Sequence, residues 1–193
     1  MVTGKEHIDK KATYVVVSNH QSQLDILAAF RTFFHFKWVS KIEVFRLPFI
    51  GWNMHLNEYI PLKRGDKESI REMLEKCRKT LKKGNSVFIF PEGTRSETGI
   101  LRPFKLGAFQ LAHELQLPIL PIAIDGTREV LPKYSLELKS TKPMNIQIMP
   151  PVPYENFQHM SEEETAAFFR KKIGAHVTAH TEDTEEPSLL TAV

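Results

Sequence analysis

The sequence predicts a single α/β domain with a mixed, partly parallel central sheet flanked by helices. Three observations lead to this prediction. Short apolar runs recur along the chain, segments of helical periodicity separate them, and neither a linker nor an internal repeat divides the 193 residues. Strands that alternate with helices are typical of parallel or mixed sheets. We place the domain at residues 1–180 and expect residues 181–193 to form an acidic, disordered tail.

The first predicted strand covers residues 14–18. It is a continuous β-branched run, as expected of a strand that is buried on both faces. Apolar residues at roughly helical spacing then predict a helix from residue 22 to 30, with Ser22 as its N-cap and Asp25 three residues later. A polar motif therefore begins where the first buried strand ends.

The clearest helix is predicted over residues 67–83, between the capping residue Asp66 and the stop residue Gly84. Its apolar residues form one stripe, which includes the single cysteine, Cys77. The remaining elements, in order, are a strand at 87–90, a helix at 105–116, strands at 118–124 and 145–149, and a helix at 161–178 that opens with a capping box.

The formal net charge of the chain is +3, but the expected tail holds four acidic residues and no base. Without the tail, 19 acidic residues remain against 26 basic ones, so residues 1–180 carry a net charge of +7. Such a surface attracts nucleic acids, anionic membranes or acidic metabolites, and charge does not choose among them.

Cysteine and histidine usage narrows the chemistry. A single cysteine excludes an internal disulfide framework and suits a reducing compartment. Because Cys77 lies on an apolar helix stripe, we expect it in the core rather than as a nucleophile. The eight histidines are scattered and form no ligand cluster with cysteine, so no metal site is predicted.

No segment contains the roughly 20 mostly apolar residues that a membrane-spanning helix needs. The first residues also lack the apolar run of a secretory signal. The chain is therefore soluble or peripheral, or an anchor lies outside it.

The strand-to-helix junction after residue 18 places His20 five residues before Asp25. Imidazole has a pKa near neutrality and serves as a general base, and a carboxylate can orient the ring and stabilise the imidazolium. Histidine and aspartate at this spacing also occur by chance, and such a pair can instead cap a helix. The spacing alone leaves both interpretations open.

Four further segments give the pair a context. Residues 19–25 (NHQSQLD) resemble the NHxSxxD block of the lysophosphatidic acid acyltransferase family, the 1-acyl-sn-glycerol-3-phosphate acyltransferases. Residues 59–66 (YIPLKRGD) are similar to its second block, in which an arginine follows a short apolar strand. Residues 90–96 (FPEGTRS) match the third block, and residues 117–122 (LPILPI) are similar to the fourth. Residues 104–109 (FKLGAF) also resemble the family.

This resemblance implies a glycerolipid acyltransferase fold and a role for each matched residue. His20 would be the general base and Asp25 its orienting partner, with direct transfer from donor to acceptor. Arg64 would bind the acceptor phosphate, because a guanidinium matches phosphate oxygens. Taken alone, Arg64 could be a solvated partner of Asp66. The remaining substrate-binding candidates are Glu92, Gly93, Thr94, Arg95 and Lys105.

The resemblance further implies an enzyme that makes phosphatidate from 1-acylglycerol-3-phosphate. The co-substrate would be acyl-CoA or acyl-carrier protein, with no other cofactor. Another lysophospholipid or glycerol-3-phosphate as acceptor, and a non-catalytic lipid-binding module, remain open. We expect no nucleic-acid partner. Family members commonly carry apolar helices before the first block, whereas here only 18, mostly polar, residues precede Asn19. We expect membrane association facing the cytoplasm, peripheral for this chain unless an N-terminal anchor lies outside it.

Residues 30–52 are dense in aromatic residues interleaved with Lys37, Lys41 and Arg46. Most of these aromatics must be core residues of an α/β domain. The rest, with the basic residues, could form a patch that rests on anionic lipid or that binds single-stranded nucleic acid. The acyltransferase blocks favour lipid.

Overall fold

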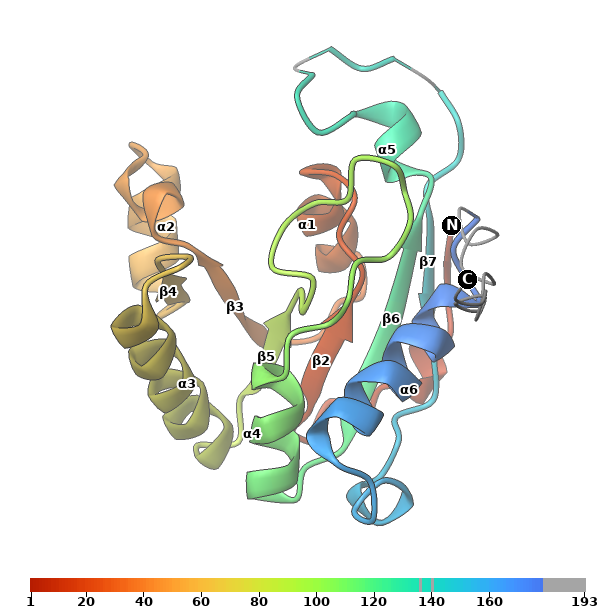
Figure 1. Cartoon of the computed structure of the whole chain (residues 1–193). Helices are drawn as coiled ribbons and strands as arrows, with labels where there is room; N and C mark the ends of the chain where they lie inside the picture. The colour runs from red at the N-terminus through yellow and green to blue at the C-terminus, as the bar shows by residue number, and fades with distance from the viewer. Residues whose placement is uncertain (136, 140, 179–193) are drawn as a thin grey trace, which may run out of the picture.

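The computed structural model describes residues 1–135, 137–139 and 141–178, so the predicted acidic tail lies outside the described residues. The described residues form a seven-stranded sheet in the order β1-β7-β6-β2-β5-β3-β4 (Figure 1). Each neighbouring pair is parallel except β6 with β7. The predicted mixed, partly parallel sheet is confirmed. The strands are β1 (Val2–Thr3), β2 (Val15–Ser18), β3 (Phe36–Lys41), β4 (Ile60–Leu62), β5 (Ser86–Ile89), β6 (Ile119–Asp125) and β7 (Asn145–Ile148).

Helices cover the two faces of the sheet unequally, as Figure 1 shows. Three helices, α3, α4 and α6, cover the face of the sheet that carries Val15 and Val17 of β2, whereas α1 lies on the face that carries Val16. Successive strand residues point to opposite faces, so the β-branched run supplies both cores. The helices are α1 (Leu24–Phe30), α2 (Ile50–Leu56), α3 (Lys67–Lys82), α4 (Gly107–Leu115), α5 (Thr127–Val130) and α6 (Glu162–Gly174), with short 3₁₀ turns η1 (Lys5–His7), η2 (Ile42–Arg46) and η3 (Tyr154–Asn156).

The predicted N-terminal caps are right for α3 and α6. The Asp66 side chain accepts a hydrogen bond from the Ser69 backbone at 3.1 Å, and the capping box of Ser161 with Glu164 is formed. Helix α6 ends at Gly174, earlier than predicted. The Ser22 N-cap is wrong, because α1 begins at Leu24 after Gln23 and the Asp25 carboxylate turns back toward the preceding loop.

The aromatic segment divides into buried and exposed parts, which the sequence did not separate. Phe36, Trp38 and Phe45 are buried, whereas Phe49 and Trp52 are exposed. Neither β3 nor α2 was predicted, because this segment has no regular periodicity. Cys77 is fully buried against Met73, and burial raises the pKa of its thiol to about 12. Its predicted core position is confirmed.

The parallel strands bring the polar loops to one end of the sheet. His20 follows β2, Arg64 follows β4, Glu92 follows β5 and Thr127 follows β6. Carboxyl ends of parallel strands meet at the same side, which is where open α/β sheets bind ligands. We call this side the carboxyl end. No helix in the described ranges combines the length and the hydropathy needed to cross a membrane.

Candidate active site

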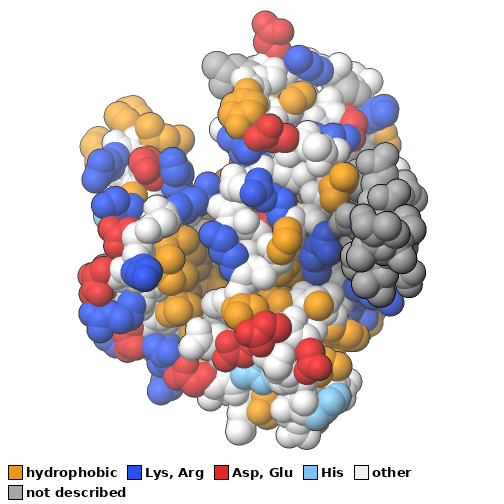
Figure 2. All heavy atoms as spheres, in the orientation of Figure 1, with side chains coloured by type: hydrophobic (Ala, Val, Ile, Leu, Met, Phe, Trp, Pro, Cys, Tyr) orange, Lys and Arg blue, Asp and Glu red, His pale blue; other side chains and the backbone are white. Residues whose placement is uncertain are grey.

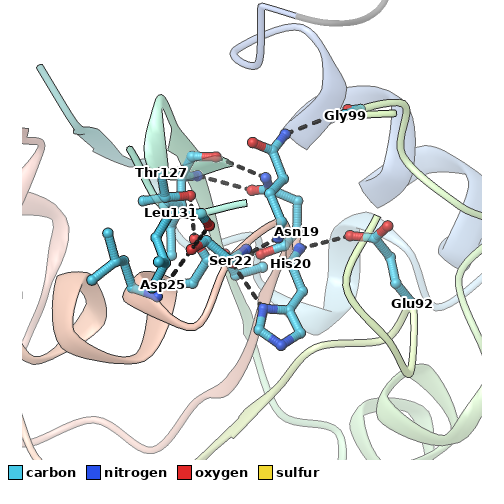
Figure 3. Close-up of polar contacts among 12 residues, drawn as sticks. Asn19, His20, Ser22, Asp25, Glu92, Gly99, Thr127 and Leu131 are labelled. Carbon is cyan, nitrogen blue, oxygen red and sulfur yellow. Dashed lines mark hydrogen bonds and ion pairs between the residues drawn. The ribbon is translucent and has the colours of Figure 1, made fainter. Parts of the chain in front are cut away.

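The catalytic candidate His20 lies at the carboxyl end of β2 with only 8% of its surface exposed. Its Nδ1 atom is 2.8 Å from Oδ2 of Asp25, a side chain with no exposed surface (Figure 3). The structure thus brings together the two residues that the sequence paired.

The Asp25 carboxylate is held by four donors. Its Oδ2 atom also accepts from the backbone N–H groups of Gln21 (2.7 Å) and Ser22 (2.8 Å), and Oδ1 accepts from the Thr127 hydroxyl at 2.5 Å. The backbone N–H groups and the Thr127 hydroxyl are donors here, so the carboxylate accepts from each of them. The proton shared with His20 therefore belongs to Nδ1, which leaves the Nε2 lone pair for a substrate proton.

Sequence reasoning assigned no role to two residues that build this arrangement, although one of them, Asn19, opens the matched block at residues 19–25. Thr127 lies 102 positions from Asp25, and its hydroxyl reaches the carboxylate only because β6 pairs with β2. The fully buried Asn19 side chain, which follows β2, makes two hydrogen bonds to the backbone of Ile124 in β6. Its amide nitrogen donates to the Ile124 carbonyl at 2.7 Å, and its amide oxygen accepts from the Ile124 N–H at 2.8 Å. No local pattern around either residue could have indicated these long-range contacts.

Glu92 supports His20 through the backbone. One carboxylate oxygen accepts from the His20 N–H at 2.7 Å and the other from the Arg102 N–H at 3.0 Å. The side chain is only 3% exposed, and burial raises its pKa to about 7. Both oxygens are thus engaged by the protein itself, so Glu92 shapes the predicted acceptor pocket by fixing its backbone.

Three basic side chains follow the other strands. Arg64 is exposed just after β4, Arg95 is half-buried in the loop after β5, and Lys105 precedes α4. Partial loss of water lowers the pKa of the Arg64 guanidinium, the negative charge of Glu43 opposes this shift, and the positive charge of Arg95 adds to it. Among the described residues, none of the three forms an ion pair.

The third block also supplies the close packing that holds one of these cations in place. Gly93 has a positive φ of 71°, and a Cβ atom there would lie 3.0 Å from Cε and Nζ of Lys105. The ammonium group of Lys105 therefore lies against the Gly93 backbone. The next residue of the block, Thr94, is half-buried. Residues 119–122 of the fourth block, by contrast, are buried in β6, and the block contributes no reactive group.

A buried histidine oriented by a carboxylate, in an α/β domain with basic side chains at the same end of the sheet, is an arrangement suited to general-base chemistry. The family model described as Acyltransferase matches residues 1–125, so this chain belongs to the acyltransferase family.

Similar proteins narrow the family further. The chain is 44% identical over 132 residues to a chloroplastic 1-acyl-sn-glycerol-3-phosphate acyltransferase of Brassica napus, covering 68% of this chain and 38% of that protein. It is 36% identical over 160 residues to the 1-acyl-sn-glycerol-3-phosphate acyltransferase of Saccharomyces cerevisiae, covering 80% of this chain and 52% of that one. The chain thus spans about half or less of the length of these relatives.

A solved structure shares the fold. The crystal structure of the 1-acyl-sn-glycerophosphate acyltransferase PlsC from Thermotoga maritima matches with a TM-score of 0.76 and 30% identity. The match covers 90% of this chain and 68% of that chain. The predicted glycerolipid acyltransferase fold is confirmed.

Proposed function

We propose that this domain transfers a fatty acyl group from acyl-CoA or acyl-carrier protein to the free hydroxyl of 1-acyl-sn-glycerol-3-phosphate, which gives phosphatidate. The carrying observation is the His20–Asp25 pair at 2.8 Å, at the same end of the sheet as Arg64 and Arg95. The names of the relatives support the same acceptor.

The reaction needs one base and no covalent enzyme intermediate. His20 Nε2 takes the proton of the acceptor hydroxyl as its oxygen attacks the thioester carbonyl. The tetrahedral intermediate then collapses, the carbon–sulfur bond breaks, and the departing thiolate receives the proton from the imidazolium. Asp25 stabilises the transient positive charge on the ring. The step balances without a redox partner, so we propose no cofactor beyond the co-substrate.

The basic side chains provide for the acceptor phosphate. Arg64 and Arg95 lie close enough for their charges to repel, although Glu43 offsets part of this effect at Arg64, and a phosphate between the two guanidinium groups would relieve the repulsion. Lys105 adds a third positive charge beside Gly93. We propose that the phosphate binds among these three groups, at the cytoplasmic surface of a membrane that holds the lipid acceptor.

The direct test is acyl transfer by the purified domain with detergent-dispersed acceptor. His20→Ala should abolish phosphatidate formation while the thermal unfolding midpoint stays near that of the wild type. His159→Ala removes an exposed histidine and is the matched control, with full activity expected. If His20→Ala turns over as fast as the wild type, His20 is not the general base and the proposed mechanism is wrong.

An acceptor panel separates the neighbouring functions. Lysophosphatidate should be favoured over lysophospholipids whose phosphate is a diester, because a phosphomonoester carries more negative charge. A wild-type domain that binds lysophosphatidate but transfers no acyl group to any acceptor would instead be a lipid-binding module.

A further inference from the structure

The segment between β3 and β4 turns its apolar side chains outward. In α2 only Gly51 and Met54 are buried, whereas Trp52 is 65% exposed and Leu56 84% exposed. A surface helix of a soluble domain normally buries its apolar face. Five large apolar side chains of this segment are exposed together, and we call them the α2 tip: Leu47, Phe49, Ile50, Trp52 and Leu56.

The backbone before α2 adopts a strained conformation that presents one of these side chains. Phe49 has φ 62° and ψ −51°, and the Ile50 N–H donates to the Pro48 carbonyl at 2.6 Å. This is a γ-turn of the rare form that is unfavourable for bulky residues. Phe49 is nevertheless 75% exposed, and its ring lies across that of Trp52, with centroids 5.3 Å apart and planes inclined by 70°. Burial in the free protein does not compensate for the strain.

The tip is rigidly attached to the domain. A Cβ atom on Gly51 would lie 2.1 Å from the Phe45 carbonyl oxygen, so α2 packs against η2 at a distance that only glycine permits. Phe45 is buried and contacts the ring of His55. The strained turn is therefore fixed between two packed elements and holds its aromatic side chain outward.

The tip lies at the carboxyl end of the sheet. The segment follows β3, which is parallel to β5, and β5 in turn is parallel to β2, which precedes His20. In Figure 2, hydrophobic side chains gather at the upper left, where Figure 1 places α2, and Lys and Arg side chains lie below them. A hollow separates this part of the molecule from the rest of the domain. Exposed Lys41 and Arg46 flank the tip, and Glu43 pairs with Lys41 at 3.4 Å.

We infer that the α2 tip inserts its aromatic and aliphatic side chains into the surface of an anionic phospholipid bilayer and so turns the carboxyl end toward the lipid. Exposed Trp and Phe beside Lys and Arg are typical of segments that lie in a membrane interface. The inference rests on the proposed function for its orientation, since a lipid acceptor would reach His20 from the same side.

Vesicle binding tests the docking directly. The wild type should cosediment with vesicles of phosphatidylcholine and phosphatidylglycerol more strongly than with phosphatidylcholine alone. Joint substitution Phe49→Ser and Trp52→Ser should lower the partition coefficient by roughly 100-fold. The matched control Ile70→Ser with Phe168→Ser removes two exposed apolar side chains from α3 and α6, and should bind as the wild type does. Equal binding by the tip variant and the wild type would overturn the inference.

Phe49→Gly separates a docking role from a structural one. Glycine adopts positive φ without strain, so this variant should unfold at a higher temperature than the wild type while binding vesicles more weakly. A buried structural side chain would give the opposite result for stability. A variant that keeps wild-type vesicle affinity would count against docking.

Trp52 provides a spectroscopic reading, because the other tryptophan, Trp38, is buried. Its emission should shift to shorter wavelength when vesicles are added, and Trp52→Phe should remove the shift. A second copy of the chain could cover the tip instead of lipid, and sedimentation without lipid tests this. A dimer that dissociates on the tip substitutions would assign the tip to self-association and overturn the inference.

Activity measurements keep the two proposals apart. With a short-chain lysophosphatidate dissolved as monomers, the tip variant should match the wild type, whereas acceptor in vesicles should be converted at least 10-fold more slowly. Tip-dependent vesicle binding without any acyl transfer would refute the proposed function and leave the docking intact. If the tip variant and the wild type convert acceptor in vesicles at the same rate, the docking inference is refuted and the proposed function stands.

Discussion

The imidazole of His20 stacks on the phenyl ring of Phe90, with ring centroids 4.1 Å apart and planes inclined by 13°. Phe90 in turn stacks on Trp38, with ring centroids 5.5 Å apart, and Trp38 belongs to the buried core of the sheet. One ring face of the proposed base is thus covered by carbon, and its Nδ1 edge is held by Asp25.

This stacking predicts a role for Phe90 in turnover. An aromatic face attracts the positive charge that develops on the ring, with a strength of about 1 kcal/mol. Phe90→Leu should therefore lower kcat by roughly 5-fold and leave the KM for acceptor unchanged. Steady-state kinetics measure both. Phe90→Tyr keeps the ring face and should retain most of the activity, so equal kcat for the leucine variant would disprove the role.

The hydroxyl of Thr127 should matter because it donates a hydrogen bond to the buried carboxylate of Asp25. Thr127→Val keeps the shape but leaves Oδ1 of Asp25 without this partner. The free energy of unfolding should fall by about 2 kcal/mol and kcat by about 10-fold, as measured by urea titration and by phosphatidate formation. Thr127→Ser restores the donor and should recover both quantities; failure to do so would assign the effect to packing.

Burial of Glu92 predicts a pH dependence of stability. Its pKa is about 7 in the folded state against 4.5 when solvated, so between these values the folded protein binds more protons than the unfolded chain. Stability therefore decreases as pH rises from 4.5 to 7, by about 1 to 3 kcal/mol from this group. Glu92→Gln has no such titration and should flatten the profile in urea unfolding. A wild-type profile that rises across this window relative to the glutamine variant would contradict the assignment.

Arg64 should act on the acceptor and not on the donor. Arg64→Ala should raise the KM for lysophosphatidate by about 30-fold, since a charge-assisted hydrogen bond contributes about 2 kcal/mol, while the KM for the acyl donor stays constant. Arg64→Lys should recover only part, because an ammonium group lacks the planar fork. Arg71→Ala, which removes an exposed arginine of α3, is the control. Parallel changes in both KM values would refute phosphate binding by Arg64.

The fold could largely be predicted from the sequence because its determinants are local. Each of these determinants involves only a few neighbouring residues, and each lies where predicted: the β-branched run of β2, the N-cap at Asp66 and the capping box at Ser161. The spacing of His20 and Asp25 likewise encodes their contact, since His20 lies in the short loop after β2 and Asp25 in the first turn of α1, which follows that loop.

Only the tertiary structure decided which way the remaining side chains turn. Strand pairing joins Thr127 to Asp25 and places Phe90 under His20, and neither contact leaves a local pattern. Glu92 has the sequence context of a ligand-binding loop, yet its oxygens meet backbone N–H groups that the fold delivers there. Whether an aromatic side chain such as Trp52 is buried or exposed depends on which face of the domain its helix covers, and residue type does not specify that face.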